Sequence, residues 1–130
     1  MANTILIVDD NPDDIEIAKT ALAETGRDIT LKTASHGKKA LEYLREGHGL
    51  PSLILLDLKM PVMNGIDTLR QIRADELLKN IPVIVATSSS FEADEKDAYE
   101  AGADGFLHKD FSIDRFSSDL ESWLRRFLNN

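Results

Sequence analysis

Short, continuously apolar runs recur along the chain, and segments with helical spacing of apolar residues separate them. Runs of this length are typical of strands buried on both faces of a parallel sheet. They predict strands at Ile5–Val8, Leu53–Leu56 and Ile81–Ala86, and Gly105–His108 predicts a short last strand. The segment Ile29–Ala34 instead alternates apolar and polar residues, which indicates a half-exposed strand at a sheet edge.

Helix signals fall between these strands. Asn11 can cap a helix that Pro12 opens, with Asp13 and Asp14 at the positive end of its dipole and Gly26 as its stop. Further helices are expected over Lys38–Glu46, from Ile66 to about Leu78, over Glu92–Glu100, and from a Ser112 cap to Phe127. The segment Glu92–Glu100 is acidic and has few apolar positions, so we expect it to dock weakly.

Five strand–helix repeats predict the α/β class, with a doubly wound, five-stranded parallel sheet. The polar second strand favours the flavodoxin-like order 2-1-3-4-5, which places that strand at an edge. This (βα)5 pattern fills residues 1–130. The sequence therefore predicts a single domain, with no output domain after the last helix.

Polar side chains stand where the predicted strands end. Asp9 and Asp10 follow the first strand, Asp57 the third, Thr87 the fourth and Lys109 the fifth. In the predicted order, the direction in which the chain adds strands to the sheet reverses between strands one and three. Ligands of such sheets bind at the carboxyl ends of the strands at this point. We therefore expect three carboxylates to meet at the binding crevice, with a hydroxyl and a lysine on the same rim.

Composition removes several classes of function. The formal net charge of −8 disfavours duplex DNA and anionic membranes as partners. The absence of cysteine excludes disulfides, thiolate catalysis and cysteine-bound metals. The sequence shows neither a signal peptide nor an apolar run long enough to span a membrane, so we expect a cytoplasmic protein.

The clustered residues favour phosphoryl chemistry. Two carboxylates about 4 Å apart repel by about 4 kcal/mol at an effective dielectric of about 20. A divalent cation relieves this repulsion, and hard oxygen ligands favour Mg²⁺. A carboxylate beside that ion is a candidate nucleophile toward phosphorus. Lys109 and Thr87 could then neutralise the phosphoryl oxygens.

These residues and their surroundings resemble the receiver domain of two-component response regulators. The resemblance rests on five segments that follow in order along nearly the whole chain. They are Asp9-Asp10, the segment from Asp57 through Met60-Pro61 to Asn64-Gly65, Thr87-Ser88, Ala101–Phe106 and Lys109. The segments Asp10–Ile15 and Thr87–Ser89 are also similar to the small stand-alone regulators that partner bacterial phytochromes.

The resemblance implies a role for each site residue. Asp57 would be the phospho-acceptor. Mg²⁺ would be bound by Asp57, by Asp10 directly, by Asp9 through water and by the backbone carbonyl of Lys59. Thr87 would be the switch hydroxyl, and Phe106 would stand at the position of the family's switch aromatic residue. Lys109 would pair with a phosphoryl oxygen. Lys59 and Ser89 flank the site and would tune the phosphate lifetime.

One position departs from the family pattern. The family usually has proline after this lysine, joined by a cis peptide bond, whereas this chain has Asp110. A cis bond before a residue other than proline costs about 3 kcal/mol, so a trans Lys109–Asp110 bond is expected. We predict that phosphorylation survives with altered rates; an Asp110→Pro protein with unchanged phosphorylation and dephosphorylation rates would contradict this.

By this resemblance the chain is a response regulator and not a turnover enzyme. A sensor histidine kinase, with a phytochrome-type kinase as a candidate, or a phosphotransfer protein would phosphorylate Asp57. Thr87 and Phe106 would then shift and change a protein-interaction surface on the fourth helix, fifth strand and fifth helix. The apolar stripe of the last helix, which includes Trp123 and Phe127, could also serve a homodimer.

Two other functions remain open at this point. One is a phospho-independent adaptor with an altered site, which the residue Asp110 motivates. The other is an aspartate-nucleophile phosphatase, but that chemistry expects an Asp-x-Asp arrangement where this chain has Asp9-Asp10. Flavin or dinucleotide binding is disfavoured, because Asp9–Pro12 stands where a glycine-rich phosphate loop would be needed.

Overall fold

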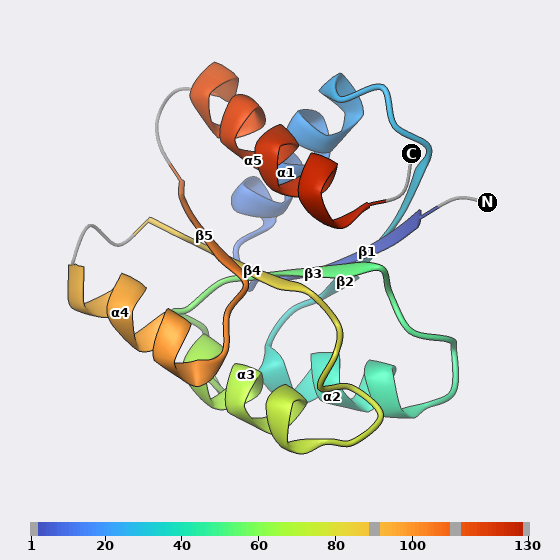
Figure 1. Ribbon diagram of the computed structural model, residues 1–130, viewed down its shortest axis with the longest axis vertical. Helices are drawn as coiled ribbons and strands as arrows, with labels where there is room; N and C mark the ends of the chain where they lie inside the picture. The colour runs from blue at the N-terminus through green and yellow to red at the C-terminus, as the bar shows by residue number, and fades with distance from the viewer. Residues whose placement is uncertain (1–2, 89–91, 110–112, 129–130) are drawn as a thin grey trace.

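A computed structural model of the chain describes residues 3–88, 92–109 and 113–128. Five strands and five helices alternate along it (Figure 1). The strands are β1 (Asn3–Val8), β2 (Ile29–Ala34), β3 (Leu53–Leu56), β4 (Val83–Thr87) and β5 (Gly105–His108). The helices are α1 (Pro12–Glu24), α2 (Gly37–Arg45), α3 (Gly65–Ala74), α4 (Glu92–Ala101) and α5 (Ile113–Phe127).

All strand pairs are parallel, and the sheet order is β2-β1-β3-β4-β5. The predicted fold class, strand order and edge position of Ile29–Ala34 are therefore confirmed. The strands β3 and β4 are buried at every position, as expected for strands covered on both faces.

Helices cover both faces of the sheet, so the molecule has three layers (Figure 1). One core cluster joins alternate strand residues such as Ile5 and Leu55 to α1 and α5. The second joins the intervening strand residues, such as Leu6 and Leu56, to α2 and α3 and to Ala98 of α4. This division follows from the strand period of two, since successive side chains point to opposite faces.

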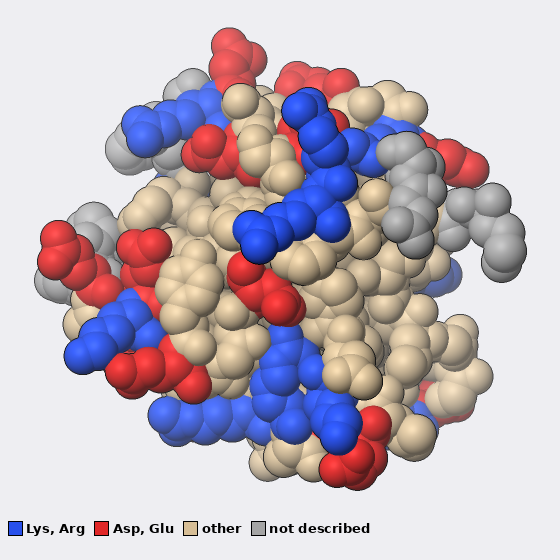
Figure 2. Space-filling model, viewed as in Figure 1, with Lys and Arg blue, Asp and Glu red and all other residues tan. Residues whose placement is uncertain are grey.

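The weak docking expected of the acidic helix is also confirmed. Ala98 is the one buried residue in α4. Figure 2 shows Asp and Glu side chains gathered over this helix, at the left of the view. The net apolar contribution of α4 to the core is therefore small compared with that of α5, where Phe116, Leu120 and Leu124 are buried.

The expected end of the third helix, near Leu78, is wrong. The helix α3 ends at Ala74, and Asp75 is extended at φ −93° and ψ 120°. The Asp75 carboxylate accepts a hydrogen bond from the backbone N–H of Leu77 at 2.9 Å. This local bond offers the chain an alternative to a further helical turn. Leu78 is nevertheless buried, because the turn that follows brings it back to the core.

The fourth strand begins at Val83, two residues later than predicted. The N–H of Ile81 donates to Leu78 in the preceding turn, and Pro82 has no N–H to offer a neighbouring strand. The caps of the first helix agree with the prediction: Asn11 accepts from the N–H groups of Asp13 and Asp14, and Gly26 follows at φ 69°. The predicted Ser112 cap lies outside the described residues.

Within the described ranges, no helix is both long and apolar enough to cross a membrane.

Candidate functional site

The sheet topology brings Asp9 and Asp57 to the same edge. In the pairing of β1 with β3, Val8 stands beside Leu56, so the residues that follow them leave the sheet side by side. The N–H of Asp57 donates to the carbonyl of Val8 at 2.9 Å, and the N–H of Asp9 donates to Ala34 at 3.0 Å. Both aspartates are therefore held by backbone hydrogen bonds at the switch point that the strand order predicts.

Asp9, Asp10 and Asp57 form a cluster in which one carboxylate oxygen from each lies within 4.8 Å of the others. Asp9 and Asp57 are buried, with 3% and 8% of their surface exposed, whereas Asp10 is exposed. Carboxylate oxygens at this spacing are the donor set that Mg²⁺ or Mn²⁺ accepts. The residues present thus fit a hard divalent cation, with one side of the site open to solvent.

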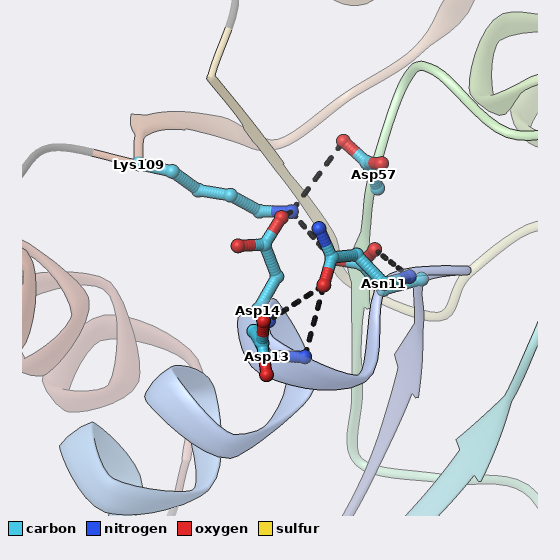
Figure 3. Close-up of polar contacts among 6 residues, drawn as sticks. Asn11, Asp13, Asp14, Asp57 and Lys109 are labelled. Atoms are coloured by element: carbon cyan, nitrogen blue, oxygen red, sulfur yellow. Dashed lines mark hydrogen bonds and ion pairs between the residues drawn. The ribbon is translucent and has the colours of Figure 1, made fainter.

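Lys109 reaches this cluster from the end of β5, the edge strand opposite β2. Its N–H donates to the carbonyl of Thr87 at 2.9 Å, which fixes the backbone just after β5. Its ammonium group donates to Asp9 and lies 3.2 Å from Asp14 and 3.6 Å from Asp57. Figure 3 shows the extended side chain ending between the Asp57 and Asp14 carboxylates. One partly buried cation therefore balances part of the charge of three carboxylates.

The charges change the pKa values of two groups. Burial raises the pKa of Asp57, Lys109 lowers it, Asp9 raises it, and hydrogen bonds from the N–H groups of Leu58 and Lys59 lower it; the result is a pKa of about 6. Burial lowers the pKa of Lys109, but the bond to Asp9 and the charges of Asp57, Asp9 and Asp14 outweigh burial and raise it. At neutral pH the site therefore holds an ammonium group beside an ionised Asp57.

The loop after β3 frames the open side of the site. The N–H of Gly65 donates to Leu58 at 2.8 Å, and a Cβ at Gly65 would lie 2.3 Å from the carbonyl oxygen of Asp57. Only glycine allows the start of α3 to pack this closely against the Asp57 backbone. Beside the loop is a cavity of about 440 Å³, whose lining includes Asp10, Lys59 and Asp94. A small group could reach the exposed side of the carboxylate cluster from there.

Thr87 and Phe106 lie on neighbouring strands, where Thr87 pairs with His108 and Phe106 with Val85, and neither belongs to the carboxylate cluster. Thr87 is the last residue of β4 and is 1% exposed. Phe106 pairs with Val85 in the β4–β5 register and packs into the core that α2 and α3 share. Its ring meets the His108 ring edge-on at 5.1 Å between centroids. The two predicted switch residues thus occupy the neighbouring strands β4 and β5.

Asp14 lies beside Lys109, a contact that was not predicted, because its sequence position indicated only a favourable place at the helix dipole. A helical side chain points back toward the helix N-terminus, and Asp14 lies in the first turn of α1, the helix that follows the carboxyl end of β1. That geometry could have indicated the contact. Asp110 and Ser89, to which altered rates and phosphate lifetime were assigned, lie outside the described residues, and so does the Lys109–Asp110 bond.

The family model of the response regulator receiver domain matches residues 5–121. The polar-differentiation response regulator DivK of Brucella abortus is 32% identical over 124 residues, which are 95% of this chain and 98% of DivK. The phosphorylated cyanobacterial phytochrome response regulator RcpA is 29% identical, with a TM-score of 0.89 over 99% of this chain and 96% of RcpA. The Mn²⁺-bound response regulator Rcp1 is 28% identical, with a TM-score of 0.85 over 98% and 96%.

The family match covers every strand from Ile5 onward and the residues Asp9, Asp57 and Lys109 that meet at the carboxyl edge. The relatives match over nearly the full length of both chains, so the likeness is one of whole domains. From its sequence, its strand order and this match, the chain belongs to the response regulator receiver domains of two-component signalling.

Proposed function

We propose that the chain is a phosphorylation-switched response regulator in which Asp57 accepts a phosphoryl group from a histidine kinase or a phosphotransfer protein. Receiver domains are signalling modules that accept phosphoryl groups in this way and bind Mg²⁺ in their acidic pocket. The observation that carries the proposal is the meeting of Asp9, Asp10 and Asp57 within 4.8 Å, with the Lys109 ammonium 3.6 Å from Asp57.

The transfer step needs an ionised acceptor. An oxygen of the Asp57 carboxylate forms a bond to phosphorus while the bond between phosphorus and the histidine nitrogen of the donor breaks, and the leaving imidazole takes up a proton. Its pKa of about 6 leaves Asp57 mostly ionised at neutral pH. The backbone N–H groups of Leu58 and Lys59 hold the carboxylate in place.

The remaining site residues would bind the metal ion and the transferred group. Asp9, Asp10, Asp57 and the backbone carbonyl of Lys59 would hold Mg²⁺, which when bound neutralises charge on the phosphoryl oxygens. Rcp1 takes up Mn²⁺, a cation of similar ligand preference. Lys109 would donate to one phosphoryl oxygen and the Thr87 hydroxyl to another.

Signal output would follow from that last contact. A phosphoryl group bound by Lys109 and Thr87 in one state only supplies the differential affinity that shifts a two-state equilibrium. Movement of Thr87 in β4 would be passed to Phe106 in β5, and so to the weakly packed α4. The surface of α4, β5 and α5 would then bind a downstream protein or a second copy of this chain.

The similarity to RcpA supports a phytochrome-type sensor kinase as the phosphoryl donor. Because sensor kinases phosphorylate their regulators on the cytoplasmic side, the proposal also implies a cytoplasmic protein. A phospho-independent adaptor is not favoured, since the carboxylate cluster and the lysine are all in place.

The test is mass spectrometry of the protein after incubation with acetyl phosphate. We expect one phosphoryl adduct that requires Mg²⁺, is lost with EDTA and is absent from Asp57→Asn. Asp119→Asn, which makes the same change on the exposed face of α5, is the control and should label as the wild type does. A wild-type protein that takes up no phosphoryl group would favour the adaptor instead.

A further inference from the structure

Lys109 has a partner outside the residues assigned to metal and phosphoryl binding. Asp14 of α1 lies 3.2 Å from its ammonium group, closer than Asp57 at 3.6 Å. The Asp14 side chain is 28% exposed and the Lys109 side chain 14%, so water screens this pair less than it screens an ion pair on the open surface. The ammonium is thus drawn toward α1 as well as toward the phospho-acceptor.

Asp14 is held in this place by the start of its helix. Asn11 caps α1 by accepting from the N–H groups of Asp13 and Asp14, and Pro12 fixes the first helical position. The Asn11 N–H in turn donates to the Asp9 carboxylate at 3.0 Å. One short segment therefore positions both Asp9 and the additional carboxylate around Lys109. Figure 3 shows Asp14 of this segment beside the end of the Lys109 side chain.

Loading of the site would affect Asp9 and Asp14 differently. A divalent cation would engage Asp9 and weaken its bond to Lys109, whereas Asp14 is not part of the three-carboxylate cluster. Asp14 then remains the partner of Lys109 on the α1 side. A phosphoryl group on Asp57 must draw the same ammonium toward itself, against this contact.

We propose that Asp14 is a positioning residue that competes with the phosphoryl group for Lys109 and so opposes the phosphorylated state. This inference rests on the proposed function, because it assumes that Lys109 binds a phosphoryl oxygen. Its consequence is that a receiver lacking the Asp14 carboxylate binds a phosphoryl group more tightly, through a lysine it already has.

The measurement is the affinity for beryllofluoride, a phosphoryl analogue, titrated at saturating Mg²⁺ and followed by backbone amide resonances. We expect Asp14→Asn to tighten binding about threefold to fivefold, the range for one partly exposed ion pair. Asp14→Glu keeps a carboxylate within reach of Lys109 and should restore an affinity near that of the wild type.

Asp13→Asn is the matched control, since it removes the same charge from the neighbouring exposed position. Among the described contacts, Lys109 pairs with Asp9, Asp14 and Asp57, and not with Asp13. Mg²⁺ affinity, titrated without beryllofluoride, should change equally in Asp13→Asn and Asp14→Asn. A general structural defect in Asp14→Asn would lower the affinities for both beryllofluoride and Mg²⁺, and it would not raise one of them.

Three outcomes would overturn the inference while the proposed function stands. They are equal beryllofluoride affinities in Asp14→Asn and Asp13→Asn, weaker binding in Asp14→Asn, and an Asp14→Glu protein that behaves like Asp14→Asn. A wild-type protein that binds no beryllofluoride and forms no phosphoryl adduct would instead remove the proposed function, and the inference with it.

Discussion

At the scale of single residues, the central feature is a carboxylate that the fold destabilises. Asp57 is 8% exposed and stands beside Asp9, and its pKa of about 6 compares with an ordinary value of 3.8. Because the folded state holds the proton more tightly than the unfolded state, ionised Asp57 opposes folding. Lys109 and two backbone N–H groups offset only part of this effect.

The first prediction follows from the sign of that difference. As pH rises from about 4 to about 6, Asp57 lowers the free energy of unfolding, and the loss persists at neutral pH. A difference of about two pKa values corresponds to about 3 kcal/mol, which solvent screening at the rim reduces to about 1–2 kcal/mol. Asp57→Asn should therefore stabilise the metal-free protein by this amount at pH 7.5.

The measurement is urea unfolding in EDTA at pH 4 and pH 7.5. The stabilising effect of Asp57→Asn should be largest at pH 7.5 and nearly absent at pH 4, where the wild-type carboxyl is protonated. Asp119→Asn, on an exposed face, should show no such dependence. An equal effect of Asp57→Asn at both pH values would mean that burial does not control the ionisation of Asp57.

Site residues at strand ends could be predicted from the sequence, whereas a site residue within a helix could not. Asp9, Asp57 and Lys109 were predictable, because each follows a strand end and parallel strands share their carboxyl edge. The pairing of Lys109 with Asp14 was not predicted, because it depends on where one helical side chain points. Residue identity at a strand end thus carried more information than identity within a helix.

At the scale of elements, the loop between β3 and α3 combines close packing with backbone strain. Val62 has a φ of 67°, and the N–H of Met63 donates to the carbonyl of Pro61 at 2.7 Å, which closes a γ-turn around Val62. Positive φ is costly for a β-branched residue, of order 1–3 kcal/mol. The Val62 side chain is 75% exposed, so packing contributes little in return.

The second prediction is that Val62→Gly stabilises the protein by about 0.5–1 kcal/mol. Glycine removes the cost of positive φ, and the greater freedom of the unfolded chain offsets part of that gain. Val62→Ala is the matched control: it shortens the exposed side chain but keeps the strained φ, so it should lie within about 0.5 kcal/mol of the wild type. Thermal unfolding of the three proteins decides the matter, and equal stability of the glycine and alanine variants would argue against strain at Val62.

The end of α3 shows that apolar spacing alone does not predict where a helix ends. Apolar spacing continues past Ala74 to Leu78, and the prediction therefore extended α3 to that residue. The carboxylate of Asp75 instead accepts from the N–H of Leu77 and is paired with Arg45 at 3.2 Å. A polar side chain that bonds to its own backbone can end a helix without changing which apolar residues reach the core.

At the scale of the whole molecule, the strand order decides which charges meet. The polar character of the second strand favoured the order 2-1-3-4-5, and this order was enough to place the ends of β1 and β3 together. The weak docking of α4 could likewise be predicted from the acidic composition of this helix. The strong clustering of acidic groups at one edge, within a chain of net charge −8, makes the molecule sensitive to cations.

The third prediction separates specific metal binding from this general sensitivity. A ligand that binds only the folded state stabilises it by about 2.7 kcal/mol at a concentration 100 times its dissociation constant. Mg²⁺ should therefore raise the midpoint of thermal unfolding well beyond NaCl of equal ionic strength. Asp10→Asn removes an exposed carboxylate that we propose as a ligand, so it should leave metal-free stability nearly unchanged while shifting the Mg²⁺ titration to higher concentration. If instead NaCl matched Mg²⁺, or if Asp10→Asn titrated as the wild type does, the carboxylate cluster would act as a screened patch of charge and not as a metal site.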